Sequence, residues 1–91
     1  MTTIADVYIE NMETRSGRGA ANRFYIEVGD KKYLQSYTTL VASCVDGRYT
    51  LDPDWCCSRT TMYYIKQFTG MDTKTLRKCI EDGTIEVRNL N

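Results

Sequence analysis

The spacing of apolar residues changes once along the chain, near Pro53. Before this point apolar and polar residues alternate, as in RFYIEV, where Phe24, Ile26 and Val28 alternate with polar neighbours and Tyr25; a period of two is typical of half-buried β-strands. After it, apolar residues recur about every 3.6 positions, which is typical of amphipathic helices. The pattern predicts strands over 4–12, 23–28, 32–44 and 48–51, helices over 62–68 and 75–82, and a closing strand over 84–91.

Turn residues support the predicted strands. Gly29 and Asp30 lie where a tight turn is expected, and the stretch between the first two strands, ETRSGRGAAN, is predicted to be a glycine-rich loop. Asp46-Gly47 is the strongest hairpin signal, because a type I′ turn needs positive φ at both central residues. Each of these turns reverses the chain, so consecutive strands are expected to be antiparallel.

Capping residues support both predicted helices. Ser58 or Thr60 can cap the first helix, and Gly70 can end it in the left-handed conformation. Asp72 or Thr73 can cap the second, with Gly83 as its stop. The inward positions are Met62, Ile65 and Phe68 on the first helix and Leu76, Cys79 and Ile80 on the second.

These elements together predict an α+β fold in the order ββββααβ. An antiparallel sheet of four to five strands would pack against two short helices. At 91 residues the chain is expected to form a single domain over 1–91 with a small core.

Charge and composition exclude several classes of function. Twelve basic residues balance twelve acidic ones, so no net charge favours direct binding to nucleic acid. The chain has no histidine, the most frequent general base at neutral pH, and we expect it not to be an enzyme. A secretory leader and an apolar run of about 18 residues are both missing, so a cytoplasmic location without membrane contact is expected.

Four cysteines in a short chain require an explanation. Zinc takes four ligands and prefers thiolates in structural sites. The chain is therefore predicted to hold a structural zinc ion through Cys44, Cys56, Cys57 and Cys79. Cys44 would come from a strand end, Cys56 and Cys57 from the connection before the first helix, and Cys79 from the second helix. Their spacing matches no standard zinc motif. Two alternatives remain open: buried thiols that fill the core, and a site in which a carboxylate replaces one thiolate, with Asp46, Asp52 and Asp54 as candidates.

Tyrosines and arginines are the candidates for a binding surface. The chain has seven tyrosines, a residue type favoured at interfaces because its ring buries area while its hydroxyl stays hydrogen-bonded. Next to arginines, exposed tyrosines suit a protein partner or stacked bases of a single strand; the balanced charge favours the protein. The predicted contact residues are Arg15, Arg18, Arg23 and Tyr63.

Several short motifs carry a resemblance to a known group of proteins. N-x-F at 22–24, QSY at 35–37, W-x-x-S-x-T-T at 55–61 and NLN at 89–91 resemble a family of small, mostly uncharacterised proteins of bacteriophages and other mobile elements. In that family the positions of Cys56 and Cys57 more usually hold an aspartate and an aromatic residue, so the resemblance implies no metal.

The resemblance implies an accessory protein of a mobile element, a group that includes inhibitors of host defence. The expected function is that of a type II anti-CRISPR protein, which binds a Cas9-type nuclease stoichiometrically in the bacterial cytoplasm and blocks DNA loading or cleavage. The alternative is a small zinc-stabilised nucleic-acid-binding or regulatory protein that uses the loop between Arg15 and Arg23.

Overall fold

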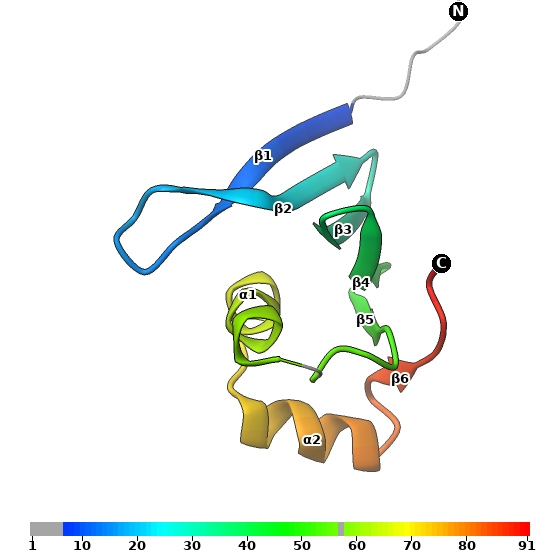
Figure 1. Ribbon diagram of the computed structural model, residues 1–91. Coiled ribbons are helices and arrows are strands. Elements are labelled where there is room, and N and C mark those ends of the chain that lie inside the picture. The colour runs from blue at the N-terminus through cyan, green and yellow to red at the C-terminus, as the bar shows by residue number, and fades with distance from the viewer. Residues whose placement is uncertain (1–6, 57) are drawn as a thin grey trace, which may run out of the picture.

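The computed structural model describes residues 7–56 and 58–91, and it confirms the predicted α+β class (Figure 1). A mixed sheet of six strands packs against two helices. In chain order the elements are β1 (Val7–Glu13), β2 (Gly19–Val28), β3 (Lys31–Ser36), β4 (Thr39–Val45), β5 (Arg48–Leu51), α1 (Arg59–Thr69), α2 (Thr73–Glu81) and β6 (Glu86–Val87).

The strands lie in the sheet in their sequence order, β1 to β6. The first five are joined by tight connections and are antiparallel, whereas β6 returns from α2 and pairs in parallel with β5. The sheet curves around α1, and α2 lies below it near β6 (Figure 1). Within the described ranges, the structure has no helix long and apolar enough to cross a membrane.

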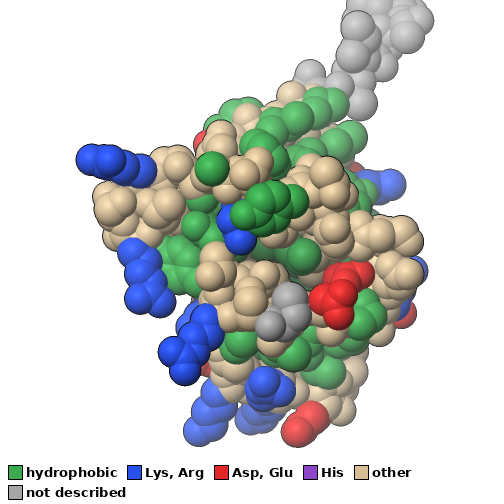
Figure 2. Space-filling model, in the orientation of Figure 1, with side chains coloured by type: hydrophobic (Ala, Val, Ile, Leu, Met, Phe, Trp, Pro, Cys, Tyr) green, Lys and Arg blue, Asp and Glu red, His purple; other side chains and the backbone are tan. Residues whose placement is uncertain are grey.

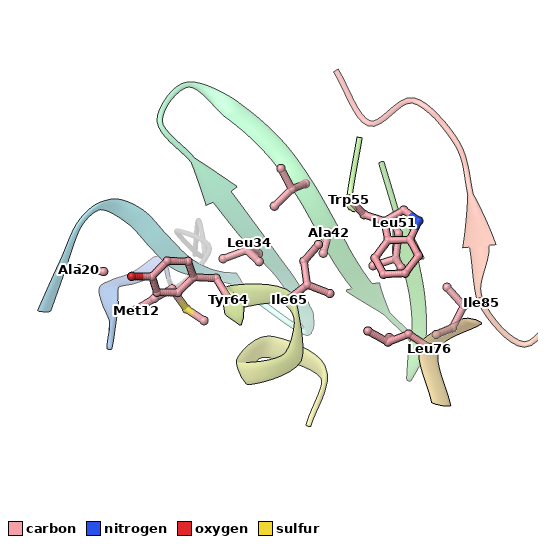
Figure 3. Packing of buried hydrophobic residues seen from close by; sticks show 11 residues of the cluster. Met12, Ala20, Leu34, Ala42, Leu51, Trp55, Tyr64, Ile65, Leu76 and Ile85 are labelled. Carbon is pink, nitrogen blue, oxygen red and sulfur yellow. The ribbon is translucent and has the colours of Figure 1, made fainter. Parts of the chain in front are cut away.

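The core lies between the curved sheet and the helices (Figure 3). One row of directly opposed strand residues, Tyr25, Leu34, Ala42 and Leu51, points to this side, and the last three are fully buried. Ile65 of α1 and Leu76 of α2 pack against it from the helices. Tyr25, and not its apolar neighbours in RFYIEV, therefore faces the core, and Phe24, Ile26 and Val28 point to the opposite side because side chains alternate along a strand.

The predicted strand over 32–44 is wrong in one respect: it is two strands, β3 and β4, joined by a turn at Tyr37-Thr38. Tyr37 has a left-handed backbone (φ 57°), and its N–H donates to the carbonyl of Asn22 at 2.6 Å. The side-chain amide of Gln35 also donates to the Tyr37 carbonyl at 2.7 Å. These bonds hold a turn that contains no glycine, proline or asparagine. Because the turn divides one predicted strand into β3 and β4, the sheet has six strands.

The predicted loop ETRSGRGAAN is also shorter than expected, because β2 starts at Gly19. Ala20 is buried, and its carbonyl accepts a hydrogen bond from the side chain of Asn11 at 2.8 Å. The side chain of Gln67 on α1 accepts from the Glu13 N–H and donates to the Glu13 carbonyl, both at 3.1 Å. This paired contact fixes the β1–β2 hairpin on α1.

The predicted hairpin turn, both N-caps and the stop at Gly70 are confirmed, whereas the C-cap of α2 is Asp82 and the predicted stop, Gly83, follows it with φ 84°. Asp46 and Gly47 both have positive φ (53° and 76°), and Gly70 ends α1 with φ 73°. The Asp72 carboxylate caps α2 by accepting from the Thr75 N–H at 2.8 Å, which lowers the pKa of this exposed group. Ser58 rather than Thr60 caps α1, since its hydroxyl accepts from the Thr61 N–H at 3.0 Å.

We expect Ser58→Ala to lower the free energy of unfolding by about 1 kcal/mol, because the first turn of α1 loses its capping acceptor. For a domain of this size the melting temperature should fall by roughly 4–8 °C, as measured by circular dichroism. Thr60→Ala, at an exposed position in the same turn, is the control and should melt near wild type. Equal melting of both variants would contradict the role of the cap.

The C-terminal residues are held by a buried carboxylate. Asp52 is 4% exposed, and its oxygens accept from the Leu90 N–H at 3.1 Å, the Asn91 amide at 3.2 Å and the Asp54 N–H at 3.3 Å. The Asn91 side chain also bonds to both backbone groups of Leu40, at 2.8 and 3.0 Å. The NLN end of the chain is thereby fixed across the ends of β4 and β5.

Candidate partner-binding surface

An uninterrupted series of arginine and tyrosine side chains crosses one side of the molecule. The guanidinium carbon of Arg23 lies 4.6 Å from the Tyr37 ring centroid and 5.5 Å from that of Tyr64. Tyr64 meets Tyr63 edge to face at 5.0 Å, and Arg15 lies 5.3 Å from the Tyr63 centroid. We call these five residues the arginine–tyrosine ladder: Tyr37, Arg23, Tyr64, Tyr63 and Arg15.

Four separate segments bring the ladder together. Arg23 is on β2, Tyr63 and Tyr64 are consecutive on α1, and Arg15 is in the hairpin loop over 14–18. The Tyr37 turn is drawn to β2 by its backbone bond to Asn22, which places the ring beside Arg23. Because Gln67 fixes the hairpin on α1, Arg15 stays next to Tyr63.

The two ladder arginines have no carboxylate partner among the described residues, where the one ion pair is Arg88 with Glu86 at 3.8 Å. An Arg23 terminal nitrogen donates weakly to the Tyr37 hydroxyl at 3.4 Å. Its Nε is buried and finds no hydrogen-bond partner in the described part of the chain. Arg23 is only half-buried, so the terminal nitrogens of its stacked guanidinium can still bind a carboxylate, a phosphate or an aromatic group of a partner.

More basic side chains surround the exposed end of the ladder. Arg15 and Tyr63 border two shallow depressions of about 300 and 600 Å³; Arg59 lines the first and Lys66 the second. Figure 2 shows Lys and Arg side chains gathered along this side, over the β1–β2 hairpin and both helices. The balanced overall charge thus conceals a surface that is locally basic.

The ladder contains three of the four residues predicted to contact a partner: Arg15, Arg23 and Tyr63. The fourth, Arg18, is exposed in the same hairpin loop. Sequence reasoning missed the roles of Tyr37, which is 56% exposed, and Tyr64, which is buried. The positive φ of Tyr37 could not be inferred from a stretch so rich in strand-forming residues.

None of the three described cysteines belongs to the ladder. Cys44 is half-buried on β4, Cys79 is half-buried on α2, and Cys56 is exposed before α1; Cys57 lies outside the described residues. Over 7–56 and 58–91, the structure contains no group of three or more His, Cys, Asp or Glu side chains placed to hold a metal. Asp52, considered as a substitute ligand, instead uses its oxygens to hold the C-terminus. The four-cysteine zinc site stays a prediction.

Three tyrosines, Tyr8, Tyr25 and Tyr49, have pKa values raised above the ordinary value for this side chain. Burial, followed by the hydrogen bond of its hydroxyl to Glu27 at 2.9 Å, raises the pKa of Tyr25 to about 12. Burial and the nearby Cys44 thiol raise the pKa of Tyr49. The protonated Tyr25 hydroxyl thus donates the hydrogen bond that ties it to Glu27 on the same strand.

Comparisons with known proteins give a family without a known activity. No curated protein and no solved structure matches the chain. Residues 7–83, which include every member of the ladder and both helices, match a family described as "Family of unknown function (DUF8033)". The chain therefore belongs to this family of unknown function.

Proposed function

We propose that this protein is a non-enzymatic binding protein that acts stoichiometrically through the arginine–tyrosine ladder. The observation that carries the proposal is the half-buried Arg23 guanidinium, which lies over the Tyr37 and Tyr64 rings and has no carboxylate partner among the described residues. Arginine and tyrosine are the residue types that most often dominate the binding energy of protein interfaces. Because two tyrosine rings already hold this arginine in place, its side chain loses little conformational freedom when a partner binds.

The partner in this proposal is a host-defence protein in the bacterial cytoplasm, a Cas9-type nuclease. The resemblance to small proteins of bacteriophages and mobile elements supports this choice. The ladder adds a constraint on the surface that is bound: the channel of such a nuclease that holds the nucleic acid is positively charged, and would repel Arg15 and Arg23. We therefore place the contact on an acidic face that controls DNA loading or movement.

Titration into a guide-loaded Cas9-type nuclease tests this proposal. We expect target cleavage to fall with added protein and to reach its minimum at about one inhibitor per nuclease, as expected for tight stoichiometric binding. The control is Arg88→Ala, which changes an exposed arginine that is not in the ladder and lines a different depression, with Tyr33 and Ser43, and should inhibit like wild type. Unchanged cleavage at large molar excess, across several orthologous nucleases, would contradict the proposal.

A second candidate function is the binding of single-stranded nucleic acid, which the alternation of arginines and aromatic rings favours. Bases stack on aromatic side chains beside cationic groups, and such binding weakens steeply as salt competes for the phosphates. A gel shift with a labelled single strand should then appear at low salt and disappear at high salt. The absence of a shift at low salt would exclude this candidate.

Zinc is proposed as a structural part of this second candidate, and metal content tests it separately. Protein purified without chelator should contain one zinc per chain if Cys44, Cys56, Cys57 and Cys79 are its ligands, with the thiols protected from modification until unfolding. Zinc-free protein in which the exposed Cys56 reacts at once would contradict the site and leave Cys44 and Cys79 as packing residues.

A further inference from the structure

We propose that two copies of this protein associate through antiparallel pairing of their β1 strands. In the described chain β1 forms one border of the sheet and pairs only with β2. Residues from Val7 to Asn11 are all exposed. Its outer row of backbone N–H and C=O groups is thus available to another strand.

From Val7 to Asn11 the β1 edge has few of the features that protect a sheet border, because the β-bulge of this strand lies further on, between Asn11 and Glu13. Its sequence VYIENME contains no lysine or proline, the residues that commonly block pairing of edge strands. The opposite border is different, because β6 has only two residues and the chain beyond it is tied to β5 through the Arg88 N–H and the Leu51 carbonyl at 3.0 Å. Pairing is therefore expected at β1.

An apolar stripe runs to this edge on the side of the sheet away from the helices. Val7 lies opposite Val28 and Ile9 opposite Ile26, and all four point away from the core, since Tyr25 points toward it. Val7 and Ile9 are each 59% exposed. A second β1 strand in the same sheet would continue the stripe with its own Val7 and Ile9.

The side chains of β1 select a second copy as the occupant and fix the register. A two-fold axis perpendicular to the sheet sets one residue of β1 directly opposite its own copy in the second chain. Centred on Glu10, the pairing would set two carboxylates opposite each other, which destabilises a strand pair. Centred on Ile9, it sets Ile9 against Ile9 and, twice, Tyr8 against Glu10, two groups that already hydrogen-bond to each other within one chain.

The register centred on Ile9 also uses the whole exposed length of the strand, from Val7 opposite Asn11 to Asn11 opposite Val7. Five residues form a small interface compared with stable complexes, so the dimer should depend on concentration. This inference does not rest on the proposed function, because the ladder and the β1 edge are different surfaces.

Sedimentation velocity of the full chain over a concentration series tests the association. Wild type should shift from one-chain to two-chain mass as concentration rises. Ile9→Lys, at an exposed position that need not disturb folding, should stay at one-chain mass with an unchanged circular dichroism spectrum. Val87→Lys, on β6 and 38% exposed, is the matched control and should dimerise like wild type. A wild-type monomer at every concentration, or an Ile9→Lys variant that still dimerises, would overturn the proposal.

Disulfide trapping tests the register. Opposed residues in an antiparallel pair have Cα atoms about 4.5–5.5 Å apart, within the range that a disulfide spans. With Cys56 replaced by serine, Ile9→Cys should give a covalent dimer under mild oxidation, whereas Val7→Cys, opposite Asn11, should not. Equal cross-linking at both positions would overturn the register centred on Ile9.

Discussion

Replacing Asp52 with alanine should lower the free energy of unfolding by about 3 kcal/mol, because its two hydrogen bonds to the C-terminal residues are lost and each contributes roughly 1.5 kcal/mol, the low end for a bond to a charged group. The melting temperature should fall by roughly 15 °C. The loss is large because Asp52 is 4% exposed. Its removal leaves the Leu90 N–H and the Asn91 amide without this acceptor at a site that water reaches poorly.

Two further variants separate this effect from general damage. Asp54→Ala removes an exposed carboxylate two residues away and should melt near wild type. Asp52→Asn keeps one acceptor oxygen for the C-terminus but presents an amide N–H₂ to the Asp54 N–H, so its stability should lie between those of wild type and Asp52→Ala. Similar stability of all three variants in urea denaturation would show that the C-terminus is held by other contacts.

Arg23→Ala should weaken binding to the partner by roughly 30-fold, the effect of losing about 2 kcal/mol at the centre of an interface. Arg23 is the ladder arginine that contacts two aromatic rings and has no carboxylate partner among the described residues. Arg23→Lys keeps the charge but loses the planar group that stacks on both rings, so it should recover only part of the affinity.

Arg88→Ala again serves as the control for the loss of one positive charge. If charge alone attracted the partner, Arg88→Ala and Arg23→Ala would weaken binding equally, and Arg23→Lys would bind like wild type. The stability of Arg23→Ala must be measured in parallel, since the guanidinium also contacts the buried Tyr64.

Local signals in the sequence predicted most of the fold. Ser58, Gly70, Asp72 and the Asp46-Gly47 turn each fix nearby backbone through their own chemistry, and all four have the predicted role. Tyr37 could not be predicted in the same way. Its left-handed conformation depends on bonds to Asn22 and Gln35, and no propensity scale contains such contacts.

The candidate site shows the same limit. Arginine and tyrosine composition pointed to Arg15, Arg23 and Tyr63, but the ladder that joins them also requires Tyr64 and the Tyr37 turn. The net charge of the sequence could not reveal the locally basic surface, because it averages over the whole molecule while basic groups gather on one side. The alternation in RFYIEV identified a strand correctly but could not show that Tyr25 faces the core.

The decisive measurement is an isothermal titration of the protein into a guide-loaded Cas9-type nuclease, run with wild type, the Arg15→Ala/Arg23→Ala double variant and Arg88→Ala. If the arginine–tyrosine ladder is the binding surface, wild type and Arg88→Ala will bind at about one per nuclease, and the folded double variant will show no measurable heat of binding. A double variant that binds as tightly as wild type would contradict the role of the ladder.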